Sequence, residues 1–470
     1  MLFSGITFIY LFLPITLIVY YGLLRKNRTA QNVFLLIMSL LFYAWGEPKF
    51  VLIMSASIVF NWLFGLLVGD AKAKGKLLQM RLFVAISVVI NLSLLFIFKY
   101  LGFAADILSS LFPSLSAVPE IALPIGISFF TFQAMSYVID VSRGRGEVQK
   151  SILNVGLYIS FFPQLIAGPI VRYETVSDEI KNRKETREDF FSGFSLFIIG
   201  LSKKVLLANA FGLLADEIFD SLFPASPVAA SVAWLGAIAY TFQIFFDFCG
   251  YSDMARGLGR MFGFHFDQNF DYPYISSSVT EFWRRWHISL GTWFRDYVYI
   301  PLGGSRVGKW RLIFNLFAVW CLTGIWHGAN FTFILWGLMY FVLLVIEKLT
   351  GLDKATRFSA LRYIVTMFFV IIGWVLFRSP SLSAALGYIL CMFGKGGATS
   401  PDFSAYLSQN LLILICGAIF SAPVIKLIPE KLSKSIAGEI LGAAALIILF
   451  ILCISSLASS SYNPFIYFNF

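Results

Sequence analysis

The chain has 470 residues, of which 58% are hydrophobic and 13% are charged, and its formal net charge at pH 7 is +10. Soluble domains carry about 25% charged residues, so this composition excludes an ordinary soluble fold. Apolar runs long enough to cross the roughly 30 Å hydrocarbon core of a bilayer recur from end to end. They predict an all-α polytopic membrane protein with about 11–12 transmembrane helices plus re-entrant segments, in a single domain over residues 1–470. In such a protein the positive charge reflects loop asymmetry, and no nucleic-acid partner is expected.

The first apolar run, residues 6–24, is predicted to be a retained membrane helix, because no small-residue cleavage site follows it. The loops after the first, third and fifth predicted helices are rich in Lys and Arg, whereas residues 101–119 and 216–228 contain acidic residues and no basic ones. By the positive-inside rule the basic loops are cytoplasmic. This count places the N-terminus and the tail, residues 458–470, outside, and residues 251–311 on the cytoplasmic side.

Residues 151–170 are apolar but end in PQLIAGP, and basic sequence lies on both sides of them. Irregular backbone at membrane depth must be covered by protein or line a cavity, so the motif PQLIAGP indicates that this segment is not a simple spanning helix. We expect a re-entrant segment that enters and leaves the membrane from the cytoplasm.

Charged residues interrupt two apolar stretches in the middle of the chain. The side chains of Lys203 and Lys204 are expected to snorkel to the cytoplasmic surface. The string DFCGYSDMARGLGR contains Asp247 and Asp253, which are candidates for the polar wall of a cavity. The alternative for both carboxylates is ordinary capping of a helix end.

The cytoplasmic or re-entrant amphipathic region contains a further candidate histidine. Within residues 281–300, the large apolar side chains fall in an arc of roughly 80° when residues are spaced by about 100°. Arg284 and Arg295 project from the opposite side, and His287 lies on that polar side near its edge. The pattern predicts one amphipathic helix at the cytoplasmic leaflet. The alternative reading makes the arginines interface anchors and His287 a polar-face residue.

A later hydrophobic segment is broken. The run of residues 312–325 gives only about 21 Å of helix at 1.5 Å per residue, which is too short to cross the membrane. It stops at TGIWHGAN and restarts at Phe331. Because irregular backbone at membrane depth needs a cover of protein or a water-filled cavity, we expect a cavity with His327 beside it and with Trp326 and Asn330 in its wall.

His327 is the main candidate for chemistry among the three histidines. An ionisable residue at membrane depth is a functional candidate by default, although a hydrogen-bonded core histidine is the alternative. Neutral imidazole can take a proton from a hydroxyl, which suits acyl transfer from a thioester to an alcohol. His265, in the turn-like string GFHFDQNF, is expected to be structural. The five cysteines lie singly in apolar stretches, so neither a metal site nor a disulfide framework is predicted.

Five strings stand in order along the chain: LFYAWGEPKF at 41–50, FPQLIAGPI at 162–170, FFDFCGYSDMARGLGRMFGF at 245–264, NFDYPYISSSVTEFWRRWHISLGTWFRDYVYIPLGGSR at 269–306 and TGIWHGANFTFILWG at 323–337. Together they resemble the membrane-bound O-acyltransferase family, in the branch containing alginate and peptidoglycan O-acetyltransferases. The resemblance runs nearly end to end and implies a ring of membrane helices around a thinned centre, with a funnel or tunnel reaching the active histidine. In that family the histidine of the WHG motif is catalytic, which here is His327. A second family histidine, in the FWRRWH motif, maps to His287.

The resemblance implies an enzyme of the bacterial cytoplasmic (inner) membrane that binds no cofactor. It is expected to move an acetyl group from a cytoplasmic thioester, acetyl-CoA being the expected donor, across the lipid bilayer. The expected acceptor is a hydroxyl of an extracytoplasmic polysaccharide, reached directly or through a secreted partner acyltransferase of the same pathway. The phosphates of CoA need cationic partners. The candidates lie in one basic stretch: Arg284, Arg285, Arg295 and Arg306, with Lys309 and Arg311.

The chain closes on PFIYFNF, an FxYFxF pattern that resembles the ends of several members of this branch. A comparable tail occurs on a small partner protein in the related teichoic-acid D-alanylation system, where the tyrosine is thought to carry the acyl group. The resemblance makes Tyr467 a candidate acyl relay. A plain aromatic anchor at the membrane interface is the alternative.

Two other classes of function compete with the enzyme. A polysaccharide transporter or flippase often shows two related halves with paired broken helices, whereas this sequence has one asymmetric polar centre. A non-catalytic scaffold would leave His327 without a purpose. The residues do not name the polymer, because alginate, peptidoglycan, cellulose and other exopolysaccharide systems share these motifs.

Overall fold

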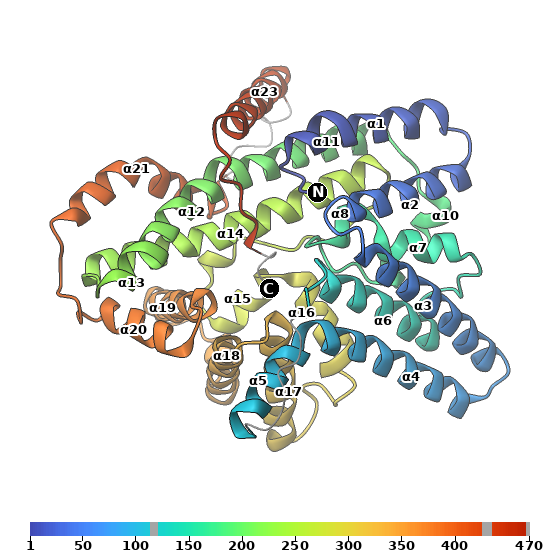
Figure 1. The fold of residues 1–470 in the computed structure, drawn as a ribbon, viewed down its shortest axis with the longest axis horizontal. Helices are drawn as coiled ribbons and strands as arrows, with labels where there is room; N and C mark the ends of the chain where they lie inside the picture. Colours follow the sequence, from blue (N-terminus) through green and yellow to red (C-terminus); the bar gives the residue numbers. More distant parts are fainter. Residues whose placement is uncertain (113–120, 425–434, 467–470) are drawn as a thin grey trace. The chain divides into compact units, whose positions relative to one another are not determined.

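The computed structural model describes residues 1–112, 121–424 and 435–466 (Figure 1). The described residues form helices and no β-strand, which confirms the all-α prediction. Many of the helices are continued by short π-helical segments, so one membrane-crossing segment can combine several elements.

The chain divides into two compact units. The first unit comprises residues 1–197 and 252–267, and the second comprises residues 198–251 and 268–470. The single domain expected for the whole chain stays a prediction.

The first unit is built around α6 (Ile127–Arg143), whose side chains are buried on all its faces. A helix buried on all its faces lies in the interior of a protein, and α3 and α4 pack against it. The other helices, in chain order, are α1 (Leu13–Ile18), α2 (Arg28–Ala44), α3 (Phe50–Ala73), α4 (Leu77–Leu95), α5 (Leu101–Leu111), α7 (Ile152–Ser160), α8 (Phe162–Leu165), α9 (Tyr173–Val176), α10 (Glu179–Asn182) and most of α11 (Arg187–Ser202).

The expected re-entrant region contains α7 and α8. With nine residues, α7 is about 14 Å long at 1.5 Å per residue, which is less than half the hydrocarbon thickness. Both helices are largely buried in protein. The segment 151–170 therefore does not contain a spanning helix, in agreement with the sequence-based expectation.

The second unit contains the elements that carry both of the candidate catalytic histidines. Its helices, in chain order, are α12 (Asn209–Asp216), α13 (Phe223–Ala225), most of α14 (Ala230–Met261), α15 (Val279–Arg285), α16 (Ile288–Phe294), α17 (Lys309–His327), α18 (Phe331–Thr350), α19 (Ser359–Arg378), α20 (Leu382–Met392), α21 (Asp402–Phe420) and α23 (Ile436–Ser459). Two π-helical segments, Lys203–Ala208 and Glu217–Leu222, flank α12, and a third, Arg295–Tyr299, continues α16.

The hydropathy of the helices confirms a multi-pass membrane protein. Eight helical stretches in the described residues are long and apolar enough to cross a membrane, and three shorter apolar helices accompany them. The most apolar 18-residue windows of α21 and α23 are only 6% buried within the protein. Such exposed apolar surface is compatible with lipid and not with water.

The broken hairpin predicted near His327 is present. Helix α17 ends at His327, and α18 begins at Phe331 with the side chain of Asn330 accepting a hydrogen bond from the Thr332 amide at 3.0 Å. An Asn in this position caps a helix N-terminus. The predicted length of the first arm was wrong, because α17 begins at Lys309 and has 19 residues.

The two arms of the hairpin pack with their backbones in close contact. A Cβ atom added at Gly324 would lie 2.6 Å from the Phe333 carbonyl oxygen, and one added at Gly337 would lie 2.5 Å from that of Trp320. Small residues at a crossing let membrane helices approach this closely. The hairpin therefore holds His327 in a position that depends on two glycines.

Candidate active site

His327 lies in a pocket of aromatic rings at the end of α17. Only 5% of the residue is exposed. The nearby rings have centroids within 6.4 Å of the imidazole: Trp326, Trp336 and Phe377 at 5.0 Å and Phe333 at 6.4 Å. Apolar walls exclude water and strengthen electrostatic interactions with the ring. This is an environment in which an imidazole can act as a base toward a reactant that enters.

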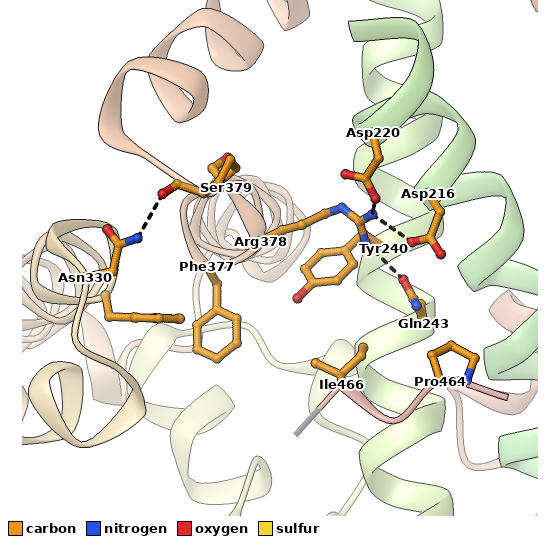
Figure 2. Close-up of a pocket in the computed structure, with 12 residues that line it drawn as sticks. Asp216, Asp220, Tyr240, Gln243, Asn330, Phe377, Arg378, Ser379, Pro464 and Ile466 are labelled. Atoms are coloured by element: carbon orange, nitrogen blue, oxygen red, sulfur yellow. Dashed lines mark hydrogen bonds and ion pairs between the residues drawn. The ribbon is translucent and has the colours of Figure 1, made fainter. Parts of the chain in front are cut away.

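A cavity of about 400 Å³ lies beside these rings (Figure 2). Phe333 and Phe377 both contact His327 and line the cavity, so the imidazole is one aromatic side chain away from it. The complete lining is Asp216, Asp220, Tyr240, Gln243, Asn330, Phe333, Phe377, Arg378, Ser379, Pro380, Pro464 and Ile466. Of the four residues proposed from sequence to line a cavity, Asn330 lies in this wall.

Charged side chains occupy another part of the cavity wall. The Arg378 guanidinium donates hydrogen bonds to Asp216 at 2.7 Å and to Asp220 at 2.8 Å, as Figure 2 shows. It also lies over the rings of Phe219 and Tyr240, at 4.8 and 4.9 Å from their centroids. The Asp220 side chain is well exposed, so this ion-pair cluster is open to solvent. The cavity is therefore apolar toward His327 and charged toward solvent.

The C-terminal tail forms part of the same wall. Pro464 and Ile466, the latter being the last described residue, both line the cavity. Tyr467, the predicted relay residue, lies outside the described residues. The residue that precedes it is thus held at the cavity that borders the His327 pocket.

Asp247 holds this tail from inside the protein. Its carboxylate pairs with the Lys204 ammonium at 2.8 Å and accepts the Ile466 backbone N–H at 2.8 Å. The expectation that Lys204 snorkels to the surface was wrong, because Lys204 is 2% exposed and its charge is balanced internally by Asp247. Asp253 belongs to the first unit, where it pairs with Arg256 at 3.3 Å.

His287 is positioned by a break in the predicted amphipathic helix. The expectation of one helix over residues 281–300 was wrong: α15 ends at Arg285, His287 has a left-handed backbone with φ of 46°, and α16 begins at Ile288. Asn269 stabilises the break, because its side-chain oxygen accepts hydrogen bonds from the Ser289 N–H at 3.1 Å and hydroxyl at 2.9 Å. The same oxygen lies 3.1 Å from the His287 Nδ1.

The break moves His287 from the expected polar face into the interior. The residue is 2% exposed, and its ring makes an edge contact with Phe248 at 4.6 Å. Burial lowers the pKa of His287 to about 3, so the ring is neutral at physiological pH.

His287 also lines a second cavity, of about 550 Å³. Arg284, Arg295 and Lys348 are basic residues of its wall, although Arg295 pairs with Asp296 at 2.8 Å and Lys348 pairs with Asp353. Trp283, Trp286 and Trp320 are among its aromatic residues. Of the other predicted donor-binding residues, Arg285 pairs with Glu281 at 3.0 Å and Asp271 at 3.1 Å, and Arg306 is an exposed residue of the loop before α17. Lys348 could not be predicted as part of this wall, because it belongs to α18, which is distant in sequence from the basic stretch.

The structure brings the two predicted catalytic histidines together through one indole. The Trp326 ring has its centroid 6.2 Å from that of His287 and 5.0 Å from that of His327. His287 lines the arginine-bearing cavity, and His327 lies behind the cavity that holds the tail. The arrangement suits transfer of a group from one cavity to the other past Trp326.

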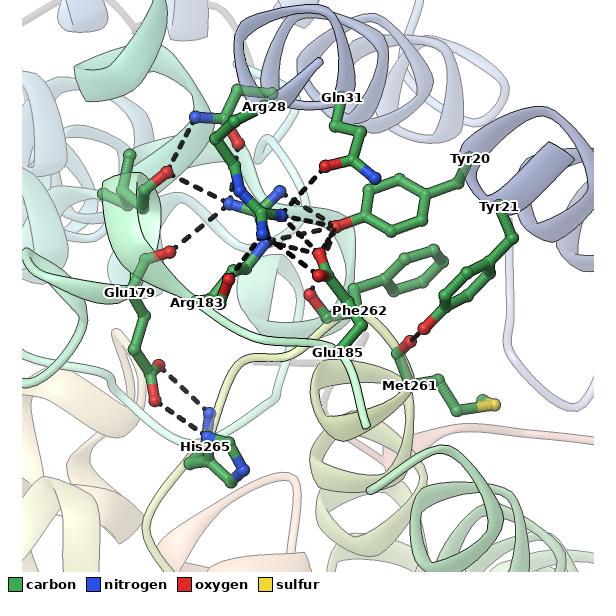
Figure 3. Close-up of polar contacts among 12 residues, drawn as sticks. Tyr20, Tyr21, Arg28, Gln31, Glu179, Arg183, Glu185, Met261, Phe262 and His265 are labelled. Atoms are coloured by element: carbon green, nitrogen blue, oxygen red, sulfur yellow. Dashed lines mark hydrogen bonds and ion pairs between the residues drawn. The ribbon is translucent and has the colours of Figure 1, made fainter. Parts of the chain in front are cut away.

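The third histidine, His265, belongs to the first unit, where it joins a polar network around Arg183 (Figure 3). Its ring nitrogens lie 2.8 Å from a Glu179 oxygen and 3.1 Å from an Asp189 oxygen. Partial burial disfavours the charged ring, but these carboxylates outweigh burial and raise the pKa of His265 above its usual value.

The rest of the network connects α2 to the segment between α10 and α11. The Arg28 guanidinium donates to Glu185 at 3.0 Å, and Arg183 donates to Asn32 at 2.7 Å and to the Tyr20 hydroxyl at 3.0 Å. Arg183 also lies over a phenylalanine ring. These contacts are consistent with the structural role expected for the region of His265.

The membrane-bound O-acyltransferase (MBOAT) family matches residues 147–392 of the chain, a range that contains both candidate catalytic histidines, Lys204, Asp247 and Arg378. A protein of Pseudomonas putida named as a probable alginate O-acetylase is 39% identical over the full length of both chains. The peptidoglycan O-acetyltransferase of Helicobacter pylori is 32% identical over 91% of this chain and 87% of its own. The teichoic acid D-alanyltransferase of Bacillus subtilis is 29% identical over 54% of this chain and 68% of its own. All three names describe group transfer, which favours the enzyme over the transporter and scaffold alternatives.

Proposed function

Because the chain belongs to the membrane-bound O-acyltransferase family and is a multi-pass membrane O-acetyltransferase, we propose that it takes its acetyl group from cytoplasmic acetyl-CoA and passes it across the bacterial inner membrane. The final acceptor is a hydroxyl of an extracytoplasmic polysaccharide, reached directly or through a secreted acyltransferase. The observation that carries this proposal is the pair of cavities on the two sides of the His287–Trp326–His327 cluster. One cavity has the charge expected of a donor site, and the other contains the C-terminal tail.

The arginine-bearing cavity is the proposed donor site. CoA carries phosphates on one end and the acyl thioester on a long arm, so its site needs cations at the mouth and an uncharged path inward. Arg284 and Arg295 supply guanidinium groups, which suit phosphate recognition. The indoles of Trp283 and Trp320 in the same wall supply apolar surface for the arm. His287, neutral because of its burial, lines the route toward Trp326 and His327.

Acetyl transfer in the tail-bearing cavity requires a base. A phenol has a pKa near 10, so Tyr467 becomes a good nucleophile only when a base takes its proton. In the proposed step His327 takes that proton, the phenolate oxygen attacks the thioester carbonyl carbon, and the carbon–sulfur bond breaks. The departing thiolate takes the proton back from His327, which leaves free CoA and the acetyl ester of Tyr467.

The second step regenerates the enzyme. A hydroxyl of the acceptor attacks the carbonyl carbon of the tyrosyl ester, the carbon–oxygen bond to the phenol breaks, and the hydroxyl proton returns to the phenol oxygen. An aryl ester is a more activated acyl donor than an alkyl ester, so transfer of the acetyl group to the acceptor hydroxyl lowers the free energy. In support of this route, Ile466, the last described residue, lines the cavity.

Labelling of the purified protein with radioactive acetyl-CoA tests the proposal. Wild-type protein is expected to acquire label on its C-terminal tail, and His327→Ala is expected to lose about 10²–10⁴-fold in labelling rate because the base is gone. His265→Ala is the matched control, because this histidine belongs to the first unit and is not a lining residue of either cavity. Equal labelling of wild type and His327→Ala would refute the catalytic assignment.

A further inference from the structure

Lys204 and Asp247 form an ion pair inside the second unit that the proposed acetyl transfer does not use. They belong to the π-helical segment Lys203–Ala208 and to α14, lie 2.8 Å apart, and are 2% and 1% exposed. Burying two charges costs more than their attraction returns unless further hydrogen bonds satisfy them. The partners that supply those hydrogen bonds therefore indicate what the pair is for.

Most of those partners belong to the C-terminal tail. The Lys204 ammonium has three donor hydrogens, and its contacts are Asp247, the Asn209 side-chain oxygen at 2.8 Å and the Pro464 carbonyl oxygen. Asp247 accepts the Ile466 N–H at 2.8 Å. Each charge thus contacts one backbone group of the tail.

The contacts fix which tail residue lies where. The Pro464 carbonyl and the Ile466 amide bracket Phe465, whose ring stacks on Tyr251 with centroids 4.5 Å apart and planes 26° apart. Upstream, Asn209 donates to the Tyr462 carbonyl oxygen at 3.2 Å. Because the tail has almost no regular secondary structure of its own over residues 460–466, these contacts replace the hydrogen bonds that a helix or sheet would supply.

We infer that the Lys204–Asp247 pair is a tail clamp, a pair of positioning residues that fix the register of residues 464–466 and thereby the reach of Tyr467. The positioning role rests on the proposed function, since it matters for catalysis only if Tyr467 carries the acetyl group. A slip by one residue would move the phenol by about 3.3 Å. Displacements of about 1 Å at a reacting group can cost 10²-fold in rate, so a loosened register would stop the relay.

Double variants separate the tail clamp from simple stabilisation by an ion pair. Either single substitution leaves one buried charge without its partner and is expected to destabilise the protein. Lys204→Met/Asp247→Leu removes both charges, which is often neutral for stability, and also removes both contacts with the tail. Lys204→Met/Asp247→Asn removes the same charges but keeps an oxygen that can accept the Ile466 N–H. An ion pair with only a structural role predicts the same behaviour for both double variants.

Carboxypeptidase digestion of the full-length protein in detergent, followed by intact mass measurement, reports on the clamp without any acetyl donor. Digestion of wild type is expected to stop at residues 464–466. In the Lys204→Met/Asp247→Leu variant it is expected to continue to Tyr462, which Asn209 and Asp216 hold independently of the pair. The variant with Asn is expected to be digested to the same point more slowly. Lys181→Met/Glu147→Leu, which removes an exposed ion pair of the first unit, is expected to digest like wild type.

The acetylation of Tyr467 from acetyl-CoA, measured by mass spectrometry on the same variants, tests the positioning role. The Leu double variant is expected to lose about 10²-fold in the rate of tail acetylation with an unchanged KM for acetyl-CoA, and the Asn variant is expected to recover part of that rate. Digestion that stops at the same residues in the Leu variant as in wild type would overturn the clamp. Extended digestion with a wild-type rate of tail acetylation would overturn the positioning role. If wild type itself acquires no acetyl group on Tyr467, the relay in the proposed function fails, and digestion alone decides the clamp.

Discussion

Substitution of Gly337 by Ala tests whether the α17–α18 hairpin sets the position of His327. An added Cβ would lie 2.5 Å from the Trp320 carbonyl oxygen, whereas ordinary contact begins at 3.4 Å. The clashing atom belongs to the backbone of α17, so no side-chain rotation relieves it. The helices must separate by about 0.9 Å at this point to restore ordinary contact.

Gly337→Ala is expected to reduce the catalytic rate more severely than the stability of the fold. Overpacking of this kind destabilises proteins by about 1–3 kcal/mol. A displacement near 1 Å at the reacting groups can reduce a rate by about 10²-fold. Trp336, the neighbour of Gly337, contacts the His327 ring, so the shift reaches the base directly. We expect kcat to fall about 10²-fold while the KM for acetyl-CoA changes little.

The measurement is acetyl transfer from acetyl-CoA by the protein in lipid nanodiscs, together with its thermal unfolding. Gly442→Ala in α23 is the matched control, because a Cβ there meets no atom within 4 Å. A Gly337→Ala protein with wild-type kcat would show that the hairpin crossing does not control the position of His327.

Four further predictions follow from the sites. His287→Ala is expected to reduce acetyl transfer less than loss of His327, because His287 lines the route; equal losses in purified protein would assign it a direct chemical role. Arg284→Ala and Arg295→Ala are expected to raise the Kd for CoA while leaving association with a partner acyltransferase unchanged, and unchanged CoA binding by calorimetry would move the donor site elsewhere. Tyr467→Phe keeps the aromatic ring and removes the hydroxyl, so near-normal acetylation of polymer in cells would leave an anchor role only. The raised pKa of His265 predicts that its carboxylate partners stabilise the folded protein. This stabilisation is full below about pH 6.5 and is lost as pH rises through the folded pKa. The unfolding temperatures of wild type and His265→Gln are therefore expected to differ at low pH and to converge at high pH.

Features that depend on neighbours along the chain were predicted correctly from sequence. The high hydropathy of consecutive residues predicted a multi-pass membrane protein, and the helical stretches confirm it. The break between His327 and Phe331 could be predicted because the glycine that follows one helix and the asparagine that caps the next lie within one helical turn of it. Both predictions rest on backbone hydrogen bonding and burial in lipid, which local sequence determines to a large extent.

Features that depend on distant partners required the tertiary structure. The pattern over residues 281–300 has helical periodicity, but Asn269 stabilises a break at His287 and turns that ring inward. Lys204 was predicted to snorkel, because nothing in its own segment indicates that Asp247 is its partner.

The division between these two groups has a physical reason. Helical periodicity, capping and hydropathy are properties of residues within a few positions of one another, so the class of protein, the broken hairpin and the candidate histidines could be predicted from sequence. A buried charge or a left-handed histidine is stable only when a partner from another segment satisfies it. Which segment supplies that partner depends on the packing of whole helices. The contacts of His287 and His327 with Trp326, and of Lys204 and Asp247 with the tail, therefore could not be predicted from sequence.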